Sequence, residues 1–92
     1  MSTAILGISL RSRYNIELKQ REFASMKLQE AIEEKGEFSH LAGVWRNEVD
    51  KHKYALYILD DVVKSISDDL NSEDKYDFFR TFLTNDNNEK VG

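Results

Sequence analysis

The sequence predicts an all-α protein, an antiparallel hairpin of two long helices followed by a short C-terminal helix. Proline, which ends helices, is absent from the 92 residues, and glycine occurs only four times. Charged residues make up 33% of the chain and hydrophobic residues 40%, as expected for helices with one apolar and one solvated face. The strongest signal is an apolar heptad spacing that runs without a slip from Trp45 to Leu70. We therefore expect a single helical domain over residues 1–84, with helices at about 10–35, 39–71 and 72–84.

The first long helix is predicted from apolar residues that recur on one side of a helical wheel. This stripe consists of Leu10, Tyr14, Leu18, Leu28 and Ile32, with Ala24 and Ala31 at its margin. Gly36 stands where a glycine commonly ends a helix in the left-handed conformation. Residues 2–10 are apolar but too few for their periodicity to distinguish a helix from a strand or an extended arm.

The second long helix has a start signal and the heptad spacing. Ser39 can serve as its N-cap, because a serine hydroxyl accepts a hydrogen bond from a free backbone N–H in the first turn. The spaced residues, called the seam below, are Trp45, Val49, His52, Leu56, Leu59, Val63, Ile66 and Leu70. A seam of this kind requires a facing helix, which the first long helix supplies by folding back at Gly36.

The short third helix is expected to begin at Asn71 or Ser72. Glu73 and Asp74 then lie in its first turn, where the helix dipole favours negative charge. It carries several large apolar side chains, and the polar segment 85–92 that follows is expected to be disordered.

Apolar residues that point away from the predicted hairpin indicate a binding surface. They are Ile16, Phe23, Tyr54, Tyr57 and Ile58. Exposing several such side chains would forfeit about 1.5–3 kcal/mol each, so a further surface must cover them. A four-helix homodimer of two hairpins is one solution, and another protein bound to these residues is a second.

His52 is the only polar residue of the seam, and Glu48 precedes it by one helical turn. Two hypotheses follow for His52. It can be a buried residue that fixes the helix register or loosens the bundle when protonated, or it can be an inert, hydrogen-bonded residue at the edge of the seam. Because the chain has no Glu-x-x-His and no His-x-x-x-His, we expect no metal site and no cofactor.

Two charged regions suggest weaker alternatives to protein binding. Arg11 and Arg13, taken to lie near a helix N-terminus where the dipole disfavours cations, could bind a phosphate or nucleotide with Tyr14 as a stacking surface. Residues 60–92 hold nine acidic and four basic residues, including the pairs Asp60–Asp61 and Asp68–Asp69. This acidic region argues against nucleic-acid binding and is expected to be a solvated surface, with mimicry of a nucleic acid as the weakest alternative.

The sequence contains no motif of a known chemistry. Cysteine is absent, and there is neither a glycine-rich phosphate loop nor a nucleophile elbow. No stretch has the pattern of a signal peptide or the length of a membrane span, so we expect a cytoplasmic protein. The function expected is that of a non-catalytic protein–protein interaction module, such as a small inhibitor, adaptor or immunity-type protein.

Overall fold

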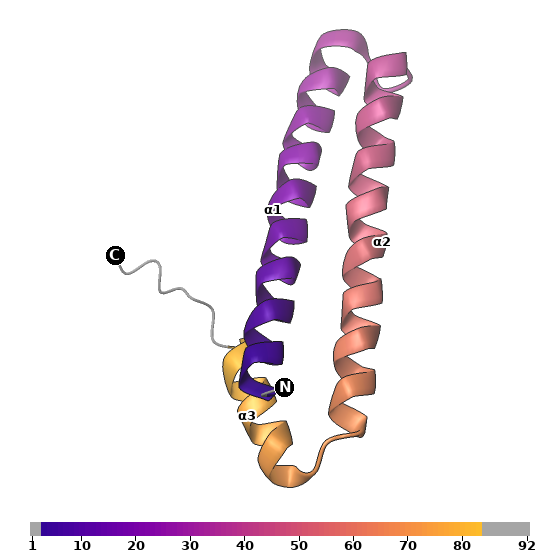
Figure 1. Ribbon diagram of the computed structural model, residues 1–92. Helices are drawn as coiled ribbons and strands as arrows, with labels where there is room; N and C mark the ends of the chain where they lie inside the picture. The colour runs from indigo at the N-terminus through magenta and orange to yellow at the C-terminus, as the bar shows by residue number, and fades with distance from the viewer. Residues whose placement is uncertain (1–2, 84–92) are drawn as a thin grey trace, which may run out of the picture. The chain divides into compact units, whose positions relative to one another are not determined.

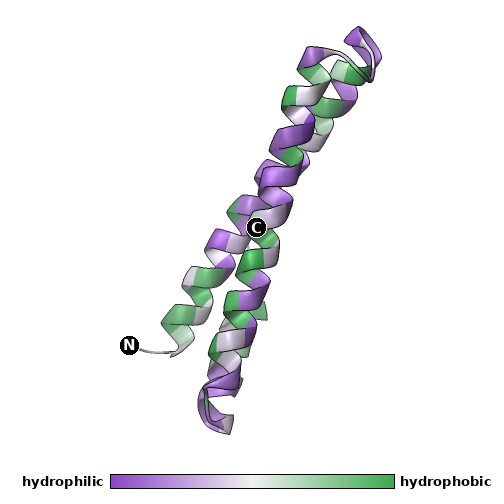
Figure 2. Cartoon of the chain, turned by 90° about the vertical axis from the view of Figure 1, so that its right-hand side faces the viewer, coloured by the Kyte–Doolittle hydropathy of each residue, from purple (hydrophilic) through white to green (hydrophobic). Residues whose placement is uncertain are grey.

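The computed structural model describes residues 3–83 and contains three helices, with no strand among these residues (Figure 1). They are α1 (Thr3–Lys35), α2 (His40–Asp68) and α3 (Ser72–Leu83). Helices α1 and α2 pack against each other as an antiparallel hairpin, so the predicted all-α hairpin is confirmed. The segment 85–92, predicted to be disordered, lies outside the described residues. Figure 2 shows polar and apolar residues interspersed along the helices.

Helix α1 begins at Thr3, well before the predicted start near residue 10. The apolar segment that the sequence left open is therefore helical from Thr3 onward. Leu6 and Leu10, one turn apart, pack against a cluster formed by α2 and α3. This tertiary packing stabilises the first turns, and no local sequence signal could reveal it.

The turn between α1 and α2 forms through the two residues predicted for it. Gly36 has a φ of 100° and its N–H donates to the carbonyl of Ile32 at 2.9 Å, which ends α1. The hydroxyl of Ser39 accepts a hydrogen bond from the backbone N–H of Ala42 at 3.2 Å. Ser39 is thus the N-cap of α2, as predicted.

A second short turn connects α2 to α3. Helix α2 ends at Asp68, three residues before the predicted end. The side chain of Asn71 then accepts a hydrogen bond from the N–H of Asp74 at 2.8 Å and caps α3. Glu73 and Asp74 occupy the first turn of α3, as expected from the helix dipole.

The helices divide into two compact units. The three-helix unit comprises, of the described residues, 3–15 and 59–83, and the hairpin unit comprises 16–58. In the three-helix unit, Val63, Phe78 and Phe82 form the buried core. Phe78 has no exposed surface, and its ring stacks on that of Phe82 with 5.9 Å between centroids.

Gly7 allows α3 to lie close to α1 inside the three-helix unit. A Cβ atom added at Gly7 would lie 2.6 Å from the backbone oxygen of Phe78 and 3.1 Å from the backbone nitrogen of Phe82. Backbone atoms cannot move away as a flexible side chain can, so this position needs a residue without a side chain.

The core of the hairpin unit is made of small residues. Ala24, Ala31 and Ala42 are at most 2% exposed, and Leu56 of the seam is also buried. The sequence placed Ala24 and Ala31 at the margin of the α1 stripe, and this placement is wrong because both are central. Their short side chains fill the inner side of α1, and the larger members of the predicted stripe lie half-buried beside them; these are Leu18, Leu28 and Ile32.

Candidate functional site

The outer side of α2 in the hairpin unit carries a compact group of large exposed side chains. Tyr54 is 65% exposed, Tyr57 57% and Ile58 47%. They lie three and four residues apart, so they are neighbours on one helical surface. Leu56, which lies between them in sequence, is buried in the seam. The three side chains therefore point away from α1, as predicted.

The two predicted residues on α1 are also exposed, but one of them takes part in the packing of the hairpin. Ile16 and Phe23 are about half exposed. The ring of Phe23 meets that of Trp45 edge-on, with 5.9 Å between centroids, and Lys27 Nζ lies 6.0 Å from the Phe23 ring. Such an edge-on pair contributes about 0.5–1.5 kcal/mol, so Phe23 helps to hold α1 against α2.

These five residues form two surfaces and not one. Phe23 follows the flank of α1 that borders Trp45, whereas Tyr54 and Ile58 lie on the side of α2 opposite the seam. Because the inner sides of the two helices face each other, their outer sides face apart. The exposed Met26, which the sequence pattern did not indicate, lies on α1 three residues after Phe23 and extends that surface.

The position of Arg11 on α1 has a structural explanation that the sequence did not provide. Since α1 begins at Thr3, Arg11 and Arg13 lie inside the helix, and their predicted location near its N-terminus is wrong. Arg11 Nε donates to the carbonyl of Phe82, and its guanidinium lies 4.5 Å from the centroid of the Phe82 ring and 5.1 Å from that of Tyr14. Carbonyls in the last turn of a helix have no partner within it, so Arg11 caps α3.

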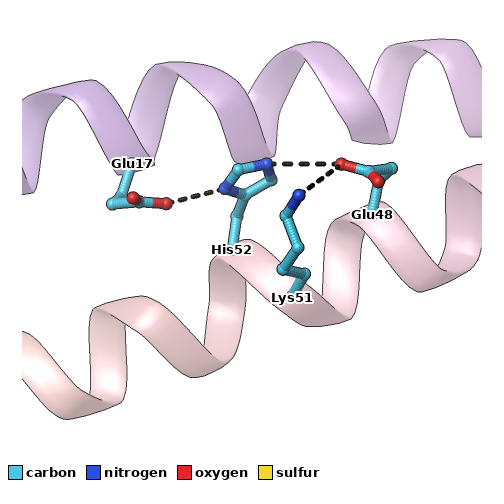
Figure 3. Close-up of polar contacts among 4 residues, drawn as sticks. All are labelled: Glu17, Glu48, Lys51 and His52. Carbon is cyan, nitrogen blue, oxygen red and sulfur yellow. Dashed lines mark hydrogen bonds and ion pairs between the residues drawn. The ribbon is translucent and has the colours of Figure 1, made fainter.

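A buried polar contact joins the two helices of the hairpin unit (Figure 3). His52 Nδ1 donates to Glu17 Oε1 at 2.6 Å, and His52 Nε2 lies 3.5 Å from Glu48 Oε1. Glu17 is only 6% exposed. The sequence predicted Glu48 as the neighbour of His52 and missed Glu17, which is the closer contact. The signal lay in the spacing, because Glu17 falls seven residues before the buried Ala24 and fourteen before the buried Ala31.

This arrangement can fix the register of α1 and α2. A hydrogen bond between buried side chains 35 positions apart is satisfied at only one alignment of α1 and α2. Between Thr3 and Leu83, no group of three or more His, Cys, Asp or Glu side chains is placed to hold a metal ion. The hydrogen bond between His52 and Glu17 agrees with the hypothesis that His52 fixes the helix register.

The outer side of α3 carries a third exposed apolar area, in the three-helix unit. An open depression there is lined by Ser72, Lys75, Tyr76, Phe79, Arg80 and Leu83. All six residues come from one helix, so the depression is a shallow surface and not an enclosed cavity. The acidic pairs Asp60–Asp61 and Asp68–Asp69 are exposed, as expected for a solvated surface.

Two further comparisons concern membrane spans and known proteins. In the part of the chain from residue 3 to residue 83, no helix has the length and apolar character needed to cross a membrane. Comparison with protein-family models, with curated proteins and with solved structures finds no match to this chain.

Proposed function

We propose that this protein is a non-catalytic interaction module that binds another protein through the outer side of α2. The observation that carries the proposal is the exposure of Tyr54, Tyr57 and Ile58 within one stretch of helix, with Leu56 buried beneath them. Tyrosine is enriched at protein interfaces, where its large rigid ring buries area at a low entropic cost. A small cytoplasmic adaptor, inhibitor or immunity-type protein would use a surface of this kind.

A binding function is favoured over a catalytic one, because three polar side chains of the kind that catalysis uses already have structural contacts. His52 and Glu17 bond to each other between the helices, and Arg11 caps α3. The open depression on α3 lacks the enclosed shape typical of a small-molecule site. The exposed tyrosines of α2 belong to a residue type with a recognised role in binding.

Substituting Tyr54 by aspartate is expected to abolish partner binding and to leave the fold intact. Tyr54 is 65% exposed, so its loss costs the folded chain little, whereas a carboxylate in an apolar interface is costly to desolvate. The measurement is capture from native cells on immobilised protein, with mass spectrometry of the bound proteins. Circular dichroism of each variant reports whether the helices persist.

Tyr76→Asp on α3 is the matched control, since Tyr76 is 69% exposed and undergoes the same chemical change. We expect the wild-type chain and Tyr76→Asp to retain the same proteins and Tyr54→Asp to lose them. Equal retention by all three chains would contradict the assignment of the binding surface to α2.

A further inference from the structure

The outer side of α2, opposite the seam, carries a second ordered row of residues. Asn47, Lys51, Tyr54, Ile58, Asp61 and Ser65 follow one another at spacings of four and three residues. All six are exposed. Because α2 is one continuous helix from His40 to Asp68, this spacing places them in a single row along its outer side, called the outer row below.

The outer row is complementary to itself when read in the opposite direction. Set antiparallel to a second α2, Tyr54 lies opposite Ile58 of the second copy, and Ile58 lies opposite that copy's Tyr54. One turn further out, Lys51 meets Asp61 of the second copy on each side. At the two ends, Asn47 meets Ser65. The two apolar pairs are thus flanked by two ion pairs and two pairs able to form hydrogen bonds.

A parallel pairing of the same row would bring like charges together where the antiparallel pairing brings opposite charges together. It would set Lys51 against Lys51 and Asp61 against Asp61, so that each charged position of the row would repel its own copy. Like charges brought together at an interface oppose association, so the row selects the antiparallel direction. In the monomer Lys51 Nζ lies 3.4 Å from Glu48, but its side chain is 66% exposed, and a pair so exposed is weak enough to yield to a second partner.

We propose that the outer row of α2 binds a second copy of this chain, with the two α2 helices antiparallel and a two-fold axis midway between Tyr54 and Ile58. This inference rests on the proposed function and names its partner. The row spans 18 residue steps, or about 27 Å of helix. One helix against another over this length makes a small interface, so we expect a dissociation constant in the micromolar range.

The test is a charge swap measured by sedimentation equilibrium from about one to several hundred micromolar protein. Either Lys51→Asp or Asp61→Lys turns both ion pairs of the symmetric dimer into repulsive contacts. Each single swap is expected to weaken dimerisation about tenfold. The double variant, Lys51→Asp with Asp61→Lys, restores both pairs with reversed signs and is expected to recover the wild-type affinity.

Lys53→Asp is the matched control, because Lys53 is exposed on α2 but lies outside the outer row. It makes the same charge change and is expected to leave dimerisation unchanged. Circular dichroism of every variant verifies that the helices are retained. A double variant as weak as the single ones would overturn the antiparallel register.

The outcomes distinguish this inference from the proposed function. A wild-type chain that stays monomeric over the whole concentration range overturns the inference, while selective loss of bound proteins by Tyr54→Asp would still support an interaction module with a different partner. Recovery in the double variant supports the second copy as the occupant of the outer row.

Discussion

Replacing Phe78 by alanine is expected to lower the free energy of unfolding by about 3–5 kcal/mol. Among residues 3–83, Phe78 is the one large side chain that is fully buried, and its ring contacts those of Phe79 and Phe82. Removing it loses the transfer free energy of a phenyl group and leaves a cavity between the three helices. For a chain of this size, such a loss is a large part of the total stability.

Urea unfolding followed by circular dichroism measures this effect. Tyr76→Ala is the control, because Tyr76 lies on the same helix but is 69% exposed. We expect a shift of the Tyr76→Ala midpoint that is small beside that of Phe78→Ala. Equal shifts for the two variants would mean that α3 does not pack against α1 and α2 through its phenylalanines.

Replacing His52 by leucine is expected to lower stability by about 2 kcal/mol, although leucine is the more apolar residue in an apolar seam. The carboxylate of Glu17 is 6% exposed and would lose its 2.6 Å hydrogen bond from His52. Removing this donor from a buried acceptor costs more than the added apolar contact returns. The sign of the change therefore tests whether the polar contact is structural.

The double variant Glu17→Leu with His52→Leu removes both polar groups together. Its stability is expected to exceed that of His52→Leu alone, because the buried carboxylate of Glu17 is then removed together with its hydrogen-bond partner. Fluorescence of the single tryptophan, Trp45, follows unfolding of the hairpin unit. His40→Leu serves as the control at an exposed histidine, and a loss there as large as in His52→Leu would contradict the role given to Glu17.

The hairpin could be predicted from the sequence because its signals are periodic or local. The seam from Trp45 to Leu70 identified the inner side of α2, and Gly36 and Ser39 identified the turn before it. Exposure of Tyr54, Tyr57 and Ile58 then followed by elimination, since a residue away from the seam points away from the facing helix.

The features that could not be predicted all depend on contacts between distant residues. The first turns of α1 are stabilised because Leu6 and Leu10 pack against the core cluster, whose phenylalanines lie on α3, about 70 residues further along the chain. The position of Arg11 is explained by a carbonyl of that same distant helix. Glu17 was missed because burial of a charged residue is favourable only beside a suitable partner. That partner, His52, lies 35 positions away in the sequence.

The most direct test of the antiparallel dimer uses the absence of cysteine from the chain. One preparation carries Lys51→Cys and another carries Asp61→Cys, and the two are oxidised mildly, alone and mixed. In the proposed dimer the two substituted positions lie opposite each other, whereas two copies of the same position are ten residues, or about 15 Å, apart along the helix. We predict that the mixture forms disulfide-linked dimers far faster than either preparation alone. Equal rates in all three samples, or fastest linkage in Lys51→Cys alone, would contradict the pairing of two α2 helices through the outer row.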